Sequence, residues 1–338
     1  MTGVVAETEM IADLRERLKD ELARVIGPSP RVALIDFPND RNSGDSAIWR
    51  GERRVLAELG AVVAYTRDMA GYDADRLRER IGADGVILIT GGGNFGDYWP
   101  RHQALRESVL RDFPAHRVVQ LPQSIAIRDR DNVARIRQAM AWHERFTVMV
   151  RDAPSLELAA DLALDARMTP DAAFGLGAIE RPVPVRKPLL VLARDDHERK
   201  FDLSAFEGPD VVVSDWRLST SQLARRTALR VAPSAARHWR AQPRLDRWTA
   251  RLREGSLEAM SRLQLESALR QLAGFSVVVT DRLHAHVLCC LLGIPHVVLD
   301  NDYGKIRAVH EAWTANSATT WLAGSVEEAR SLAAVLLD

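Results

Sequence analysis

The sequence predicts an α/β protein made of two parallel-sheet domains that face each other across a cleft. Two observations support this prediction. Short runs of β-branched residues alternate with longer segments of helical period along most of the 338 residues, which is typical of parallel sheets covered by helices on both faces. A segment with three prolines in nine residues, 180–188, interrupts the pattern and has the composition of a hinge-like linker. We therefore expect one domain at 1–180 and a second at 181–338.

The first domain begins with a predicted helix. Apolar residues recur at helical spacing through 7–26, and the pattern ends at Gly27-Pro28, a typical stop signal. Strands are expected after it at 31–36, 61–66, 85–90, 117–121 and 146–150. In parallel α/β sheets the ligand binds beyond the carboxyl ends of the strands, so the loops that follow these strands are where a site is expected.

The second domain repeats the pattern after the linker. Its strands are expected at 189–193, 210–214, 276–280 and 296–300. Its helices are expected at about 256–273, 283–292 and 304–315. In their alternation of strands and helices, both domains are expected to be Rossmann-like.

The composition is that of an ordinary globular protein. Lys plus Arg and Asp plus Glu both total 46, so no net charge attracts the chain to nucleic acid and no such partner is expected. The first residues carry charges where a signal peptide would need an apolar stretch, and the longest apolar region, 287–299, is broken and too short for a membrane span. The adjacent Cys289 and Cys290 resemble small core residues. A cytoplasmic location is expected.

Polar residues and glycines follow four strands of the first domain. They are Asn42 and Asp45, then Gly92, Gly93 and Asn94, then Gln123 and Ser124, and finally Arg151. Helix capping explains the first pair equally well. Three consecutive glycines, 91–93, permit close backbone approach and favour a ligand over a plain tight turn. Their spacing fits neither a Walker loop nor a dinucleotide fingerprint.

The second domain places charged side chains after its third expected strand. Arg282, His284 and His286 stand where that strand gives way to an apolar helix, and Lys305 follows the next strand. Arginine and lysine suit a carboxylate or phosphate, and histidine moves protons near neutral pH. In an extended strand Arg282 and His284 would lie on one side, whereas in a helix Arg282 and His286 would share a face, so the three side chains cannot all point to one site. One of the two histidines is therefore expected to be structural. The set predicts an anion site with proton transfer.

A metal site is the alternative use of the two histidines, because His-x-His can supply two ligands. Zinc needs at least a third ligand, and the sequence contains no Cys-x-x-Cys and no His-Glu-x-x-His. We therefore expect no metal. The other histidines are expected at the surface, among them His102, His116, His143 and His238.

Five short motifs, taken in order, resemble those of the polysaccharide pyruvyl transferase family. They are N-x-G-D at 42–45, GGGN at 91–94, Arg-Asp at 151–152, PDAAF at 170–174 and DRLHAH at 281–286. Each motif is short, and it is their order and spacing that carry the resemblance. It extends over residues 31–310, except that nothing aligns in 200–255.

The resemblance implies a GT-B-like pair of domains and an enzyme that moves pyruvate from phosphoenolpyruvate onto a sugar of a cell-surface polysaccharide or its lipid-linked precursor, as a ketal. It implies that His284 is the catalytic acid and base, and that Arg151, Arg282 and Lys305 bind the donor, supported by His286. Phosphoenolpyruvate is a co-substrate, so no cofactor is expected. From loop position, we expect the acceptor on the first domain, bound by Asn42, Asp45, Gly92, Gly93, Asn94, Gln123 and Ser124.

An arginine-rich segment, 217–253, lies largely outside the resemblance. It holds ten arginines and one acid, Asp246. Five of the arginines form a stripe at helical spacing, namely Arg237, Arg240, Arg244, Arg247 and Arg251. Pro243 is expected to divide the segment into two helices. A solvated helical face is the ordinary explanation. With Trp239 and Trp248 nearby, the alternative is contact with anionic lipid or a lipid-linked diphosphate acceptor at the inner face of the membrane.

Two other functions remain open from the sequence. A GT-B-type glycosyltransferase would need a nucleobase pocket and usually an acid for the ribose, where the second domain offers Arg282, His284 and Lys305, which better suit a compact anion. A non-catalytic saccharide-binding relative would keep the fold and lose turnover, and the same three residues argue against it. Thermal-shift comparison of phosphoenolpyruvate with nucleotide-sugars would distinguish the three functions.

Overall fold

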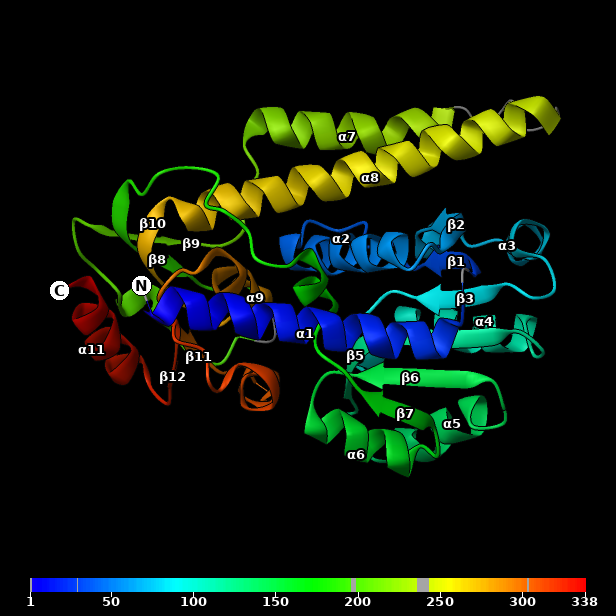
Figure 1. Ribbon diagram of the computed structural model, residues 1–338, viewed down its shortest axis with the longest axis horizontal. Helices are drawn as coiled ribbons and strands as arrows, with labels where there is room; N and C mark the ends of the chain where they lie inside the picture. The colour runs from blue at the N-terminus through cyan, green and yellow to red at the C-terminus, as the bar shows by residue number, and fades with distance from the viewer. Residues whose placement is uncertain (1, 29, 196–198, 236–242, 303) are drawn as a thin grey trace.

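Two parallel sheets, each covered by helices, make up the protein (Figure 1). The computed structural model describes residues 2–28, 30–195, 199–235, 243–302 and 304–338. The expectation of an α/β protein with two Rossmann-like parallel sheets is confirmed. The division at 180/181 stays a prediction. None of the described helices combines the length and the apolar composition that a membrane crossing requires.

The first sheet has seven strands, all paired in parallel. In spatial order they are β2 (Val62–Arg67), β1 (Arg31–Ile35), β3 (Val86–Ile89), β5 (Arg117–Ala126), β6 (Phe146–Val150) and β7 (Asp165–Met168), with β4 (Gly92–Gly96) also paired to β5. Val32 lies opposite Val63 of β2 and Val86 of β3. The chain therefore reverses its direction of progress across the sheet between β1 and β3.

The second sheet has five parallel strands in an equivalent order. They are β12 (Thr320–Ala323), β11 (His296–Leu299), β10 (Phe275–Thr280), β8 (Lys187–Leu192) and β9 (Val211–Ser214). Here the reversal falls between β8 and β10. Such a reversal is a topological switch point, where the loops after adjacent strands diverge and leave a crevice at the carboxyl ends.

The helices cover both faces of each sheet. We call the part of the molecule that contains the first sheet the first half, and the part that contains the second sheet the second half. The helices of the first half are α2 (Ser43–Glu58), α3 (Ala74–Ile81), α4 (Pro100–Asp112), α5 (Asp131–Met140) and α6 (Ala153–Asp161), with short 3₁₀ turns at η1 (Met69–Gly71) and η2 (Ala172–Leu176). Alternate residues of β1 belong to the cores on opposite faces of the sheet. Ala33 and Ile35 pack with α3–α6, whereas Val32 and Leu34 pack with α2. This period of two is the reason that a continuous apolar run forms a strand buried on both faces.

The second half carries η3 (Leu203–Ala205), α7 (Thr220–Ala235), α8 (Pro243–Ala273), α9 (Leu283–Leu292), α10 (Lys305–Val309) and α11 (Val326–Leu337). A π-helical turn, His310–Thr314, follows α10. Pro243 begins α8, where its missing N–H costs nothing. It thus separates two helices as expected, while Arg237 and Arg240 of the predicted stripe and Trp239 lie outside the described residues.

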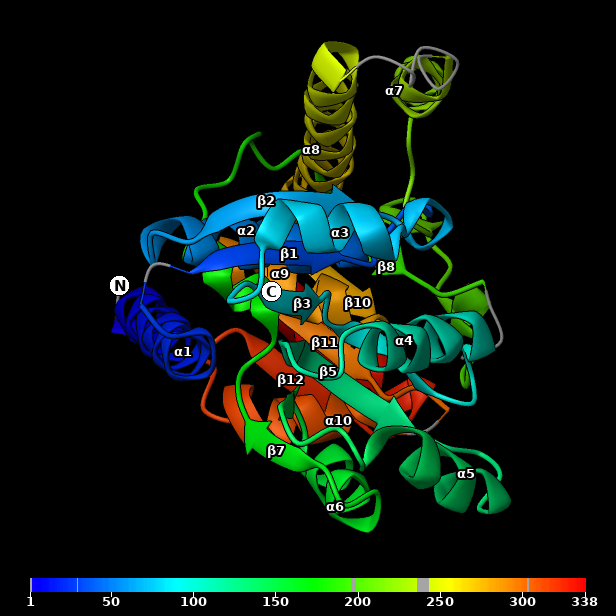
Figure 2. The same ribbon diagram turned by 90° about the vertical axis from the view of Figure 1, so that its right-hand side faces the viewer.

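Two long helices span both halves of the molecule. α1 (Thr2–Ile26) and α8 both run lengthwise past the two sheets (Figure 1). Leu18 of α1 and Met260 of α8 belong to the core beneath the first sheet, whereas Leu14 and Leu265 of the same helices belong to the core beneath the second. The halves are therefore joined by shared packing as well as by the 180–188 connection. The α7–α8 pair stands out from one side of the body (Figure 2).

Three local expectations differ from the structure. The glycines 91–93 do not form a simple loop, because Gly92–Gly96 pair with β5 as the short strand β4. β5 itself runs on to Ala126, with a shift in its register to β6 between Gln120 and Gln123 where Pro122 cannot donate to the ladder. The sequence also did not predict β7 and β12, because each is an edge strand that lacks a continuous run of apolar residues.

Candidate active site

A cavity of about 690 Å³ opens between the two halves. The loops after β1 and β3 form one wall, and the residues after β8 and β10 form the other, so both switch points face the same space. Nine predicted site residues line it: Asn42, Asp45, Gly92, Gly93, Asn94, Arg151, Arg282, His284 and Lys305. The cavity thus lies where the doubly wound topology leads us to expect a ligand.

His284 and Arg151, which come from different halves, meet at a buried carboxylate. His284 Nε2 lies 3.5 Å from Asp171 Oδ2 and 3.4 Å from Arg151 Nη1. Arg151 forms a salt bridge with the same Asp171 oxygen, and both side chains are almost completely buried. Arg151 also donates through Nε to Ser124 Oγ at 2.9 Å, and Trp313 Nε1 donates to its carbonyl at 2.8 Å. The guanidinium is therefore fixed before any ligand arrives.

The electrostatics of this group favour a neutral imidazole beside an ionised carboxylate. Desolvation alone would raise the pKa of Asp171, but attraction to Arg151 and the contact with His284 hold it well below its usual range. Desolvation lowers the pKa of His284; Asp171 opposes this shift, whereas Arg151 and Lys305 reinforce it. At neutral pH His284 is consequently uncharged and able to accept a proton.

The first turn of α2 lies directly against His284. Asn42 caps this helix, with its Oδ1 accepting from the Gly44 N–H at 3.1 Å, and its Nδ2 donates to Asp45 Oδ2 at 2.8 Å. A Cβ added at Gly44 would lie 2.4 Å from His284 Nδ1, which is far too close. Glycine is therefore needed here because the imidazole approaches the helix backbone. Asn42 both caps α2 and lines the cavity, so the two explanations of this motif are compatible.

Asp45 is an unusual carboxyl group in the cavity wall. Desolvation, and after it the neighbouring Asp40 carboxylate, raises the pKa of Asp45 to about 8, while Lys305 and Arg151 oppose the shift. With its pKa shifted towards neutral pH, Asp45 can donate a hydrogen bond to a ligand oxygen when it is protonated and accept one after losing the proton.

The GGGN segment forms another part of the same wall. Gly92 has a φ of 136°, which side-chain-bearing residues rarely adopt. Asn94 Oδ1 accepts from Gln123 Nε2 at 2.7 Å and from Arg106 Nη2 at 2.9 Å, which fixes the orientation of the amide. Gln123 and Ser124 lie within β5, buried behind Asn94 and Arg151, and neither lines the cavity. The structure thus places these two residues as supports of cavity residues.

The opposite wall concentrates positive charge. Arg282 directly precedes α9 and forms a salt bridge with Asp215, while Arg194 follows β8 and Lys305 begins α10. All four line the cavity, and three of them are cationic. The first half contributes four carboxyl groups to the other wall, Asp36, Asp40, Asp45 and Asp68, together with Arg41, Arg101 and Arg151. Cations therefore outnumber acids on the side of the second sheet, whereas the two nearly balance on the side of the first.

Comparison with known protein families covers most of the chain. Residues 42–303 match the model of the family described as "Polysaccharide pyruvyl transferase". The chain belongs to the polysaccharide pyruvyl transferase family. It is an enzyme of that family, as the motifs predicted, and the family implies a polysaccharide acceptor.

Two relatives whose names refer to pyruvyl transferases are similar to this family member. Pyruvyl transferase 1 of Schizosaccharomyces pombe is 34% identical over 295 residues, which cover 84% of this chain and 69% of the relative. EpsO of Bacillus subtilis, whose name assigns it provisionally to the pyruvyl transferases, is 29% identical over 318 residues and 91% of each chain. A crystal structure of a Klebsiella pneumoniae protein of uncharacterised function matches with a TM-score of 0.59 at 17% identity. It covers 92% of this chain and 99% of that one, and shows the fold alone.

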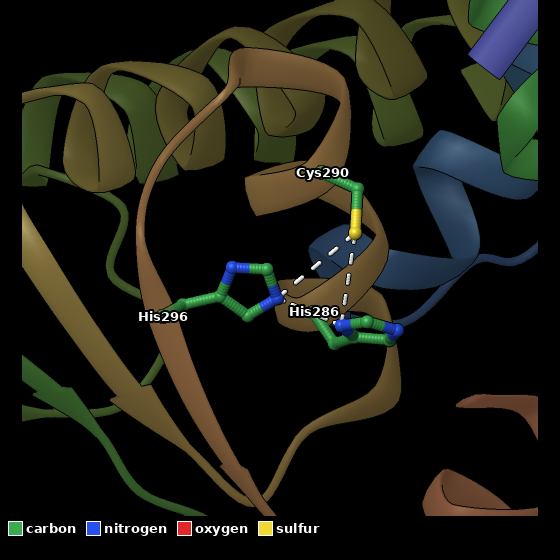
Figure 3. Close-up of side chains that lie close together, drawn as sticks. All are labelled: His286, Cys290 and His296. Atoms are coloured by element: carbon green, nitrogen blue, oxygen red, sulfur yellow. Dashed lines mark hydrogen bonds between the residues drawn. The ribbon is translucent and has the colours of Figure 1, made fainter. Parts of the chain in front are cut away.

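His286 does not reach the cavity of this family member. Helix α9 begins at Leu283, so His284 and His286 point to different sides of its first turn. His286 is fully buried beside Cys290 and His296 (Figure 3). Its Nδ1 lies 2.7 Å from His296 Nε2, and its Nε2 lies 2.9 Å from Thr314 Oγ1. The structure therefore separates His286 from the donor residues with which it was grouped.

The three side chains in Figure 3 are the candidate metal ligands of the described part of the chain. His296 Nδ1 donates to the Ile294 carbonyl at 2.7 Å, so its Nε2 is free to accept from His286 Nδ1. His286 Nε2 then accepts from Thr314, and each ring nitrogen has a partner. Two nitrogens bound to one zinc would lie about 3.4 Å apart. The geometry fits a hydrogen-bonded chain of neutral rings better than a metal site.

Other site features escaped the sequence reasoning. His102, expected at the surface, lines the cavity with its Nδ1 2.8 Å from Asp36 Oδ2. Of the other histidines expected at the surface, His143 is buried and His116 is half-buried, whereas His238 lies outside the described residues. Asp171 stands in the PDAAF motif, which contributed to the family resemblance but for which no role was expected. Cys289 and Cys290 are fully buried free thiols, as expected of core residues.

Proposed function

We propose that this enzyme transfers the pyruvyl group of phosphoenolpyruvate to two hydroxyls of a saccharide, forming a pyruvate ketal, with His284 as the acid and base. The observation that carries the proposal is one cavity in which His284 stands among Arg151, Arg282 and Lys305. Phosphoenolpyruvate brings about three negative charges, which these cations would offset on desolvation. A nucleotide-sugar would call for a nucleobase pocket that this cationic wall does not resemble.

The proposed reaction needs a proton donor first and proton acceptors afterwards. The methylene carbon takes a proton and becomes a methyl group, and one acceptor hydroxyl adds to the central carbon and gives up its proton. Phosphate then leaves with its bonding electrons, and a second hydroxyl closes the ketal and gives up its proton. A bound trianion would raise the pKa of His284 from its lowered resting position, so the ring could first hold and then deliver the proton.

Donor and acceptor would occupy opposite walls. Arg282 and Lys305, with Arg194 beside them, would hold the donor's phosphate and carboxylate on the side of the second sheet. The acceptor would lie against the first sheet, where Asn42, Asp45 and Asn94 offer polar atoms, Gly92 and Gly93 expose backbone, and Gln123 and Ser124 act from behind. Trp99 lines this side and is 38% exposed, a suitable platform for a sugar ring.

Incubation with phosphoenolpyruvate and a panel of saccharides, followed by mass spectrometry, tests the proposal. We expect a saccharide whose mass rises by one pyruvyl ketal, together with an equal amount of released phosphate. Nucleotide-sugars run in parallel control for glycosyl transfer. Phosphoenolpyruvate that neither stabilises the protein against heat nor releases phosphate with any saccharide would contradict the proposal.

A further inference from the structure

A second cavity, of about 440 Å³, adjoins the active-site cavity. It lies between the segment that follows β2 and the α7–α8 pair, which includes part of the 200–255 stretch where the motifs showed no resemblance. Asn39, Asp68 and Ala70 line both cavities. The two cavities are therefore neighbours that share part of one wall.

The second cavity is lined by an excess of positive charge. Four arginines contribute to its wall: Arg67 and Arg76 from the first half, Arg230 from α7 and Arg253 from α8. Among the described residues only Asp68 and Asp73 supply acids to that wall. The cavity thus carries two more cations than carboxylates, although the whole chain has no net charge.

Both acids are already engaged in local structure. Asp68 accepts from the Gly71 N–H at 2.9 Å and from Asn39 Nδ2 at 2.7 Å. Asp73 accepts from the Arg76 N–H at 3.1 Å, and its other oxygen lies 3.3 Å from Arg76 Nε. Asp68 and Asp73 therefore each support a turn of the backbone, and Asp73 is also paired with Arg76. The four arginines outnumber these two acids in the cavity wall.

The wall that carries Arg230 is tied to the loop after β1, which lines the active-site cavity. Arg226 of α7 is 5% exposed; its Nε donates to Gln264 of α8 at 2.9 Å, and its Nη2 donates to the carbonyls of Asn39 and Asp40. Asn39 and Asp40 belong to the loop that lines the active site. The α7–α8 pair is thus held in a fixed position relative to the loop on the proposed acceptor side, as a substrate subsite requires.

We propose that the second cavity binds a phosphate or diphosphate group carried by the saccharide acceptor while its sugar lies in the first cavity. Guanidinium groups bind phosphate oxygens through paired hydrogen bonds. The subsite adjoins the wall assigned to the acceptor, opposite the donor cations, so it serves a second anionic group and not phosphoenolpyruvate. The inference rests on the proposed function for the placement of the acceptor. A lipid-borne and a nucleotide-borne diphosphate share this chemistry.

Calorimetric titration with inorganic pyrophosphate, farnesyl diphosphate and UDP tests the subsite in the full chain. The double variant Arg230→Gln/Arg253→Gln is expected to weaken pyrophosphate binding by about tenfold or more, because charge-assisted hydrogen bonds are lost. The matched control is Arg225→Gln/Arg251→Gln, which removes two exposed arginines of the same helices that do not line the cavity. It should bind pyrophosphate as the unmodified protein does.

A third variant separates the two sites. Arg282→Gln should weaken phosphoenolpyruvate binding and leave pyrophosphate binding unchanged, whereas the Arg230/Arg253 variant should do the reverse. Tighter binding of farnesyl diphosphate than of pyrophosphate would point to a lipid-borne acceptor, and tighter UDP to a nucleotide-borne one. Pyrophosphate binding that is absent, or is lost only with Arg282→Gln, overturns the inference. If the unmodified protein bound pyrophosphate but not phosphoenolpyruvate, the result would contradict the proposed function and leave the anion subsite standing.

Discussion

The imidazole of His284 occupies the space that a side chain at Gly44 would fill, with its Nδ1 2.4 Å from the position of the missing Cβ. The two residues belong to different halves of the molecule, α9 and α2. Two helices that begin at switch points of separate sheets therefore meet at their first turns. This contact sets the position of the proposed catalytic group relative to the loops of the first sheet.

Gly44→Ala is expected to displace His284 and lower turnover by about 100-fold, because small misplacements of a reacting group are costly. The fold should survive, since the ring can move into the cavity that it lines. Steady-state phosphate release and thermal unfolding measure the two effects. Gly255→Ala in α8 is the control: nothing lies within 4 Å of its added Cβ, and turnover should not change. Equal turnover of both variants would refute the steric requirement.

His284→Ala is expected to abolish ketal formation while phosphoenolpyruvate still binds. General acid–base groups contribute about 10²–10⁴-fold to rate, so the residual turnover should be at most about one per cent. The donor cations Arg151, Arg282 and Lys305 remain in this variant. Calorimetry with phosphoenolpyruvate, alongside mass spectrometry of the saccharide, separates binding from chemistry. Near-normal turnover would remove His284 from its assigned role.

Asp171→Asn is expected to destabilise the protein by about 3–5 kcal/mol, because the buried Arg151 loses its compensating charge. The pKa of His284 should fall further, since Asp171 is the group that raises it. Chemical denaturation measures the first effect, and NMR titration of the imidazole measures the second. Asp161→Asn, an exposed acid at the end of α6, provides the matched loss of charge and should alter neither. An unchanged His284 titration would show that the carboxylate does not control the ring.

The buried histidine chain makes a prediction for acid stability. Desolvation lowers the pKa of His296 to about 4, so the folded protein keeps this ring neutral while the unfolded chain protonates it near its ordinary pKa of about 6.5. The unfolded state binds more protons between these values. The free energy of unfolding should therefore fall as pH decreases from about 6.5 to about 4, by roughly 3 kcal/mol for this group.

His296→Gln should reduce that dependence on pH, although it weakens the fold at neutral pH by breaking the contact with His286. Urea denaturation at several pH values gives the slope for each protein. His116→Gln, at a half-exposed site, should retain the full slope. Removal of metals with EDTA should not move any midpoint, because hydrogen bonds already occupy the ring nitrogens. A zinc-dependent midpoint would favour the metal site over the hydrogen-bonded chain.

Local patterns were sufficient to predict the principal strands and the loops that carry charge. β1, β3, β8 and β10 are short apolar runs flanked by polar turns, and a strand buried on both faces needs little else to be recognised. The carboxyl-end rule then selected Asn42, Asp45, Arg151, Arg282 and His284, which line the cavity, and also Gln123, Ser124 and His286, which do not. Family motifs added the activity, which no spacing of residues could have supplied.

The amino-acid sequence alone was enough to predict two parallel α/β units, and to find at their strand ends the arginine, lysine and histidine residues that we propose bind an anion and transfer a proton. Which of these residues converge on one site depends on the tertiary structure. It joined Asp171 to His284 and Arg151, turned His286 into the core, and placed Gln123 and Ser124 behind the wall. It also tied α7 to the loop after β1 through Arg226. These outcomes depend on how two sheets pack against each other, and contacts between distant segments leave no periodic signal in the chain.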